Sequence, residues 1–437
     1  MRLHGTMAIN GKGHLTVGGC DTVDLAENFG TPLYIMDEAY IREVCGQYRE
    51  TYIEPYPGNE VLYAAKAFLT MAMVRVVAQE GLGLDVVSGG ELYTALQAGF
   101  DPARICFHGN NKSREEIYAG VRANVGRIMV DNPAELDTLE SVCAELGQTV
   151  SAVPRITPNV AAHTHEYVQT GQLDSKFGQA IATGQAMDLI QKIIQSKHVR
   201  LKGVHCHIGS QIFEIEAFRL AVQNMVAFVS EVREKTGVAL EELNLGGGFG
   251  IYYTEGDDPQ PIQSFARSIM DAVRQETGKY GLPVPRVVIE PGRSIVGAAG
   301  ITLYRVGDVK VIPDVRVYVA VDGGMTDNPR YALYQAKYEA ALANRMNDPL
   351  TVTASIAGKC CESGDMVARD VQLPGVAPGD LLTVFSTGAY NYSMSSNYNR
   401  LPKPAVVLVN GGKADIIVKR ETPEDIIRND VVPDRLR

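Results

Sequence analysis

The stretch VLYAAKAF at residues 61–68 ends an apolar, strand-like run at one lysine, Lys66. A lysine amine behind such a run can be partly desolvated, which lowers its pKa and lets the neutral amine condense with an aldehyde. The bland alternative is a surface lysine whose stem lies along the protein while its charge reaches water. On this stretch alone the surface lysine is favoured, so the rest of the chain must decide between the two.

Seven further apolar runs resemble the first, and stretches with helical spacing separate them. Together these runs predict eight strands at 61–65, 82–88, 104–109, 127–132, 152–157, 201–209, 243–248 and 286–292. Repeated strand-then-helix units predict a (β/α)8 TIM barrel, in which the functional site lies at the C-terminal ends of the strands. An open doubly wound sheet is the alternative fold.

The pattern changes after residue 295, where short alternating strands are separated by Gly and Pro. This predicts a C-terminal antiparallel β domain, completed by the β-like N-terminal segment. The expected domains are therefore a barrel at 31–295 and a β domain at 1–30 and 296–437, with one helix near 334–346. The long polar stretch 159–177 is typical of a lid, and its length is equally consistent with disorder.

Polar or glycine residues end most of the predicted barrel strands and would converge on one mouth. They are Lys66, Asp85, Ser88, His108, Asn110, Arg155, His207, Ser210, Gly246 to Gly248, Glu290 and Arg293. Any one of them is easily structural, but so many at the same strand ends are hard to explain as caps alone.

The loops after the last two strands predict a phosphate site, because glycines let backbone amides approach an anion. These loops read GGGFG (246–250) and PGRSIVG (291–297). A plain glycine-rich turn is the alternative. A dinucleotide fingerprint is excluded, since Ile251 stands where the third glycine of that motif belongs.

A lysine together with a phosphate site suggests a phosphorylated aldehyde, and pyridoxal 5'-phosphate is the common one. Glu290 is then the natural acid for the pyridine nitrogen, and His207 would stack on the ring. A buried, hydrogen-bonded histidine is the alternative for His207. His205 shares its face of the strand, while Cys206 points the other way.

Bulk properties limit the remaining function classes. The 437 residues carry a net charge of −10 without a basic patch, which argues against a nucleic-acid partner. No apolar run is long enough for a membrane helix, and the N-terminus lacks a signal-peptide core. Seven scattered cysteines without zinc-like spacing are typical of reduced thiols, so we expect a cytoplasmic enzyme without a metal site.

Motifs along nearly the whole chain resemble the diaminopimelate decarboxylase family, which belongs to the fold-type III pyridoxal phosphate enzymes. They include YAAKAF, LDVVSGGEL, HGNNKS, HCHIGSQI, NLGGGFGI, EPGRSIVG, DGGMTDNPRYALYQA, CCESGD and GAYNYSM. EPGR and GGGFG are shared by the decarboxylases of this fold, whereas DGGMTDNPR combined with CESGD is much narrower. The resemblance implies an alanine-racemase-like barrel with a β domain, and conversion of meso-diaminopimelate to L-lysine and CO2 as the last step of lysine biosynthesis.

The resemblance also implies roles for individual residues. It makes Lys66 the Schiff-base lysine, His207 the stacking residue and Cys361 a proton donor supplied across a homodimer interface. It implies cofactor contacts from Asp85, His207, Ser210, Gly247, Gly248, Glu290, Gly292, Arg293 and Tyr390, and substrate contacts from Arg293, Arg330, Tyr334, Glu362 and Tyr390. Lys359 and Cys360 depart from the family pattern, and strand alternation with CESGD favours Cys361 as the catalytic thiol.

Two other functions stay open from the sequence. One is a decarboxylase of another amino acid or polyamine precursor such as carboxynorspermidine, which the set Arg330, Tyr334 and Glu362 disfavours. The other is a cofactor-carrying or regulatory protein without turnover, which the presence of both Lys66 and Cys361 disfavours.

Overall fold

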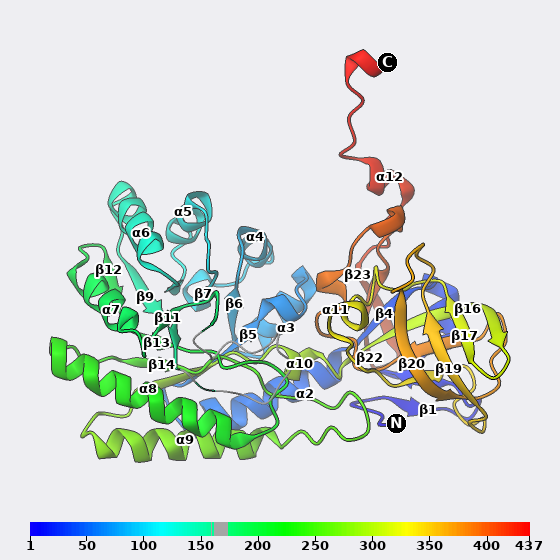
Figure 1. Ribbon diagram of the computed structural model, residues 1–437, viewed down its shortest axis with the longest axis horizontal. Helices are drawn as coiled ribbons and strands as arrows, with labels where there is room; N and C mark the ends of the chain where they lie inside the picture. Colours follow the sequence, from blue (N-terminus) through cyan, green and yellow to red (C-terminus); the bar gives the residue numbers. More distant parts are fainter. Residues whose placement is uncertain (159, 161–173) are drawn as a thin grey trace. The chain divides into compact units, whose positions relative to one another are not determined.

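The computed structural model describes residues 1–158, 160 and 174–437, and it divides into two compact units (Figure 1). The β unit comprises Met1–Ile41, Tyr252–Asp257 and Val296–Arg437, and the barrel unit comprises Arg42–Ile251 and Asp258–Ile295. Most of the lid expected at 159–177 lies outside the described residues. Among the described residues, no helix combines the length and the apolar character needed to cross a membrane.

The barrel unit is built on parallel strands that follow one another around a ring. Along the sheet they run β12 (Val199–Leu201), β9 (Val150–Pro154), β8 (Arg127–Val130), β7 (Ile105–Phe107), β6 (Gly83–Val86), β5 (Glu60–Ala64), β15 (Arg286–Ile289), β14 (Glu242–Asn244) and β13 (Gly203–His205). A parallel bridge between Arg155, directly after β9, and His205 on β13 closes the ring. Only Lys202 separates β12 from β13, so these two form one barrel strand and the predicted eightfold barrel is confirmed.

Helices follow the barrel strands and lie outside them in Figure 1. They are α3 (Met71–Gln79), α4 (Gly89–Gln97), α5 (Arg114–Arg122), α6 (Pro133–Leu146), α7 (Gln185–Gln195), α8 (Ile215–Thr236) and α9 (Ile262–Lys279). Four begin at a side chain that accepts a hydrogen bond from a first-turn backbone amide, namely Thr70, Ser88, Ser113 and Asn132. Each cap fixes the residue at which a helix begins. It thereby sets the length of the loop between that helix and the preceding strand, which carries the strand-end side chains.

The interior of the barrel is apolar in its middle and charged at the N-terminal ends of the strands. Leu62, Cys106, Met129, Val153 and Val288 form the buried middle layer. At the charged end, the fully buried Glu242 accepts hydrogen bonds from Arg127 at 2.8 Å and from Arg286 at 2.7 Å. Glu60 bonds the same two arginines but is 36% exposed.

Replacing Glu242 with alanine is expected to destabilise the barrel unit by about 3–5 kcal/mol, because it leaves two arginines short of a buried partner. Glu60→Ala is the matched control, and it should cost about 1 kcal/mol since water can solvate the same charges. Urea unfolding of both variants measures the difference. Equal losses for the two variants would contradict the distinction between the buried and the exposed carboxylate.

The β unit holds a mixed sheet with the strand order β20-β19-β17-β16-β4-β22-β23, in which β21 also pairs with β16 and β18 pairs with β21. Its strands are β4 (Leu33–Asp37), β16 (Gly300–Ile312), β17 (Arg316–Val321), β18 (Ala340–Leu342), β19 (Val352–Ala357), β20 (Met366–Leu373), β21 (Leu381–Val384), β22 (Ala405–Asn410) and β23 (Lys413–Val418). Most neighbours are antiparallel as predicted. β17 with β19 and β4 with β22 are parallel, because long connections return the chain in the same direction.

The N-terminal segment packs into the β unit, as the sequence predicted. It forms a small sheet of β1 (Ala8–Ile9), β2 (Leu15–Val17) and β3 (Cys20–Asp21), followed by α1 (Thr22–Phe29). Leu15 and Val17 are buried in one cluster with Leu33 and Ile301. The expected barrel start at residue 31 precedes β4, whose pairing with β16 and β22 places it in the β unit.

The helix expected near 334–346 is replaced by one short helical turn and a strand. Helix α11 covers Arg330–Tyr334 and ends because Gln335 takes a left-handed φ of 51°, and β18 then pairs with β21. The remaining α-helices and β-strands of the described residues are α2 (Glu38–Tyr48), β10 (Ile156–Thr157), β11 (Gln179–Ala180), α10 (Arg293–Val296) and α12 (Pro423–Ile427).

Candidate active site

The structure brings the predicted strand-end residues of the barrel unit to one end of the barrel. Lys66 follows β5 in a short 3-10 turn (Ala65–Ala67), where its side chain is exposed between two buried alanines. Burial has the largest effect on the pKa values of Asp85 on β6 and of His207 after β13, and the Lys66 charge also acts on both groups, which places the amine near them. Lys66 is therefore an accessible amine with a carboxylate and an imidazole beside it.

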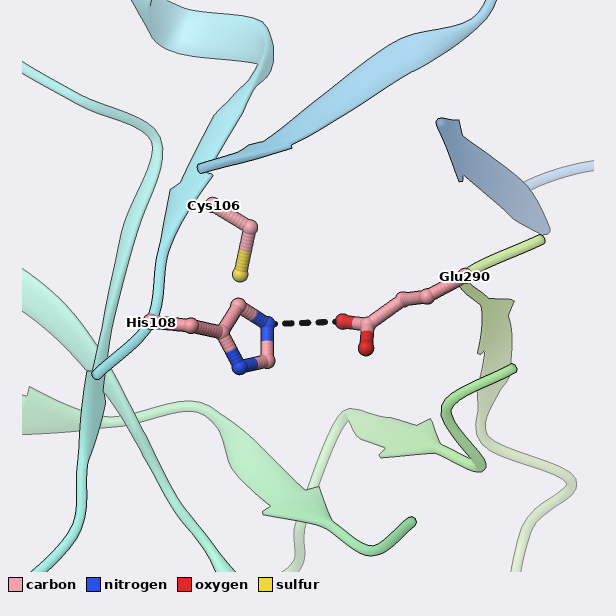
Figure 2. Close-up of side chains that lie close together, drawn as sticks. All are labelled: Cys106, His108 and Glu290. Atoms are coloured by element: carbon pink, nitrogen blue, oxygen red, sulfur yellow. Dashed lines mark hydrogen bonds and ion pairs between the residues drawn. The ribbon is translucent and has the colours of Figure 1, made fainter. Parts of the chain in front are cut away.

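Glu290, directly after β15, is buried and bonded at both carboxylate oxygens. His108 Nε2 lies 2.8 Å from Oε1 (Figure 2), Asn244 Nδ2 donates to the same oxygen at 2.7 Å, and His205 Nε2 lies 3.3 Å from Oε2. Burial raises the pKa of Glu290, but the two histidines outweigh it and hold that pKa well below its ordinary value. Glu290 thus stays ionised and can hold a proton on a ring nitrogen.

Asp85 and His207 differ from Glu290 in their protonation. Burial raises the pKa of Asp85 to about 6, and its Oδ1 has no hydrogen-bond partner among the described residues. Burial, with the nearby Lys66 charge, lowers the pKa of His207 well below its ordinary value. The Gly247 amide donates to His207 Nδ1 at 3.2 Å, so the neutral ring is fixed and can stack on a flat ligand.

The glycine loop after β14 packs too closely against neighbouring backbone to hold side chains. A Cβ added to Gly247 would lie 2.1 Å from the Glu290 carbonyl oxygen, and one on Gly248, whose φ is +112°, would lie 2.4 Å from the Gly209 carbonyl oxygen. Neither position tolerates a side chain. The buried Arg293 donates to Ser210 Oγ at 2.8 Å beside this loop, which adds a positive charge suited to phosphate.

Arg330 in the β unit is a buried guanidinium held by tyrosines. Its Nη1 donates to Tyr338 at 2.5 Å and to Tyr253 at 3.2 Å, and it lies over both rings. Among the described residues no carboxylate lies within ion-pair distance of it. Because an unpaired buried charge is costly, this guanidinium is poised to bind an anion.

The two neighbouring cysteines of the β unit have opposite surroundings. Cys360 is buried, and burial together with Asp365 raises its pKa to about 12. Cys361 is exposed, and its backbone amide donates to Asn399 Oδ1 at 2.6 Å. Asp365 fixes this loop by accepting from the amides of Met325 and Cys360 at 2.6 and 2.7 Å. The accessible thiol is therefore Cys361.

Three further predicted residues lie in the β unit and one glycine in the barrel unit. Glu362 is exposed and Tyr334 is half-buried on α11. Tyr390 adopts a left-handed φ of +64°, a strained conformation that is common at functional sites. Gly292 approaches the chain near Lys66, since an added Cβ would lie 2.9 Å from Ala64 Cβ.

Sequence reasoning missed Asn244, Tyr253 and Tyr338. Asn244 lies two residues before Gly246 and so shares its face of the strand, a signal that could have identified it. Tyr253 and Tyr338, which contact Arg330, are separated from it by 77 and 8 residues in the sequence, and neither lies in a recognisable motif.

Comparison with known proteins gives the class to which this site belongs. Residues 39–297 match the family model of the pyridoxal binding domain of pyridoxal-dependent decarboxylases. The diaminopimelate decarboxylases of Bacillus subtilis and Bacillus methanolicus are 53% and 51% identical, over 99% and 96% of this chain and 98% of each relative. The crystal structure of diaminopimelate decarboxylase from M. jannaschii in complex with L-lysine has a TM-score of 0.93 at 38% identity and covers 99% of both chains.

The fold and the match over the barrel make the protein a pyridoxal-dependent decarboxylase. At this identity over nearly the full length, the chain belongs to the diaminopimelate decarboxylase family. Its cofactor is pyridoxal 5'-phosphate, and the residues present fit that group. The exposed Lys66 amine, the ionised Glu290 and the buried Arg293 beside the glycine loop match its aldehyde, ring nitrogen and phosphate.

Proposed function

We propose that the protein removes the carboxyl group at the D-configured centre of meso-2,6-diaminopimelate and releases L-lysine and CO2, as the last step of lysine biosynthesis. When bound, pyridoxal phosphate supplies the electron sink that decarboxylation needs. The residues proposed to hold it are Lys66, Asp85, His207, Ser210, Gly247, Gly248, Glu290, Gly292, Arg293 and Tyr390. Those proposed to contact the substrate are Arg293, Arg330, Tyr334, Glu362 and Tyr390.

The observation that carries this substrate assignment is the buried Arg330, for which the described part of the chain offers no carboxylate within ion-pair distance. The far end of diaminopimelate carries both a carboxylate and an ammonium group, whereas a substrate such as ornithine has no distal carboxylate. A guanidinium can bind that carboxylate through two parallel hydrogen bonds. The exposed Glu362 offers a charge for the ammonium group.

The barrel residues have distinct tasks in this proposal. Lys66 anchors the cofactor, and Glu290 keeps a proton on the ring nitrogen because its own pKa is held low. The neutral His207 orients the ring by stacking, without adding a positive charge. Cys361 delivers a proton to the carbon that has lost its carboxylate.

We propose a homodimer in which Cys361 of one subunit serves the site of the other. The exposure of Cys361 supports this, since a donor to a neighbouring subunit must be accessible in the single chain. We also propose a cytoplasmic location, which the seven free cysteines support.

Replacing Arg330 with methionine is expected to raise KM for meso-diaminopimelate by about tenfold or more, because the substrate loses a buried charged partner. Activity toward L-ornithine or L-lysine, which lack the distal carboxylate, should change little. Arg428→Met, at an exposed arginine of the same unit, is the control and should behave as wild type. Equal losses with all three substrates would contradict the assignment of Arg330 to the distal carboxylate.

A further inference from the structure

Two buried carboxylates of the barrel unit face a single histidine nitrogen. His108 Nε2 lies 2.8 Å from Glu290 Oε1 and 3.7 Å from Asp85 Oδ1, and all three side chains are at most 6% exposed. Figure 2 shows the His108 ring directed at the Glu290 carboxylate from the end of β7. Asp85 Oδ1 has no hydrogen bond among the described residues, so His108 is its nearest counter-charge.

We propose that His108 is a positioning residue that keeps Glu290 ionised, by placing a positive charge between Glu290 and Asp85. The proposal rests on the role assigned above to Glu290, that of holding the proton on the cofactor's ring nitrogen. Like charges buried together cannot both stay ionised without compensation, and one of them takes up a proton. Without His108, Glu290 becomes able to take that proton itself and to lose its hold on the ring nitrogen.

His205 cannot supply this charge, although it bonds the other oxygen of Glu290. Burial lowers the pKa of His205 to about 4, so its ring is neutral near pH 7. Its Nδ1 has no hydrogen-bond partner in the described part of the chain, and Nε2 donates the hydrogen bond to Glu290. For His108, burial alone would lower the pKa, but Asp85 and Glu290 outweigh burial and raise it. Charge from His108 and a neutral hydrogen bond from His205 are therefore separable contributions.

The other groups facing Glu290 do not replace His108. Cys106 on β7 and Cys206 after β13 are neutral thiols, because burial raises the pKa of both. Arg155, after β9, is a cation that also faces Asp131. Lys66, after β5, acts electrostatically on Asp85. His108 is thus the cationic side chain bonded directly to Glu290.

A divalent metal is the competing use of this cluster, since ligand atoms of Cys106, His108 and Glu290 lie within 4.8 Å of one another. The direct hydrogen bond between His108 and Glu290 joins two of the atoms that a metal would need. The protonated Cys106 thiol is also a poor ligand. These contacts favour the positioning role.

The test compares His108→Gln and His205→Gln with His198→Gln, at a half-buried histidine between α7 and β12 of the same unit. In His108→Gln we expect kcat at pH 7 to fall about tenfold or more, with KM for meso-diaminopimelate little changed. The acid limb of kcat should move up by about one pH unit or more, because Glu290 then takes a proton at higher pH. The pH dependence of the bound cofactor's visible absorbance should move by the same amount. His205→Gln should move the acid limb much less than His108→Gln, because it removes a neutral hydrogen bond and no charge, and His198→Gln should match wild type.

Several outcomes would overturn the proposal. A His108→Gln enzyme with a lower unfolding midpoint but unchanged pH profiles would make His108 merely structural. Stoichiometric zinc that is lost from Cys106→Ser and His108→Gln proteins would make the cluster a metal site. Glu290→Gln distinguishes a failure of the role proposed for Glu290 from a failure of the role proposed for His108. If that variant keeps full kcat, the role proposed for Glu290 fails; if it is inactive while His108→Gln is normal, only the present inference fails.

Discussion

A Lys66→Ala variant is expected to lose turnover by roughly a thousandfold or more, because it removes the amine that bonds covalently to the cofactor. The rest of the cofactor site stays intact, since Glu290, Arg293 and the glycine loop do not depend on this side chain. The variant should therefore still bind pyridoxal phosphate, but reversibly. Borohydride reduction followed by mass spectrometry should attach the cofactor to the Lys66 peptide in wild type and to no peptide in the variant.

Lys192→Ala is the matched control for this experiment. Lys192 lies on α7 of the same unit, is 40% exposed and pairs with Asp137 at 2.7 Å. Its loss should leave both turnover and borohydride labelling at the wild-type level. Labelling of a different lysine in wild type, or normal turnover of Lys66→Ala, would contradict the assignment of Lys66 as the residue that bonds to the cofactor.

The second large effect is expected at Cys361, where replacement by alanine should lower kcat by about a hundredfold to ten-thousandfold, the usual range for loss of a general acid. Cofactor binding and its visible spectrum should stay unchanged. Cys360→Ala is a close control, because its thiol is buried and its pKa is raised to about 12, which makes it a poor proton donor at neutral pH. A Cys360→Ala enzyme as impaired as Cys361→Ala would show that the wrong thiol has been assigned.

Mixing two inactive variants tests whether Cys361 acts on the neighbouring subunit. In a shared-site dimer, a Lys66→Ala subunit paired with a Cys361→Ala subunit contains one site with both residues intact. Random exchange of equal amounts should then restore about a quarter of the wild-type activity. If both residues act within one chain, the mixture stays as inactive as its parents.

Much of the barrel and its site could be predicted from the sequence because the relevant signals are local. Strand-end residues such as Lys66, His207 and Glu290 follow short apolar runs, and parallel strands bring such ends together. The run Gly246–Gly248 is a local signal too, and the structure has no room for a Cβ at Gly247 or Gly248.

The rest depends on contacts between distant residues, which a single sequence does not reveal. The tyrosine pair around Arg330 joins three separate segments, and the direction of β4 beside β22 follows from the course of the chain between them. The charge on His108 depends on Asp85 and Glu290, which lie on two other strands. The prediction of a helix near 334–346 was wrong, because the φ of Gln335 leaves the helical region after one turn.

The most direct test of the whole account is to add meso-diaminopimelate to the purified protein loaded with pyridoxal phosphate, while recording the visible spectrum, CO2 and free amino acid. The account predicts a change in the cofactor band on substrate addition, with CO2 and L-lysine released in equal amounts. A bound cofactor that responds to the substrate without releasing CO2 would contradict it.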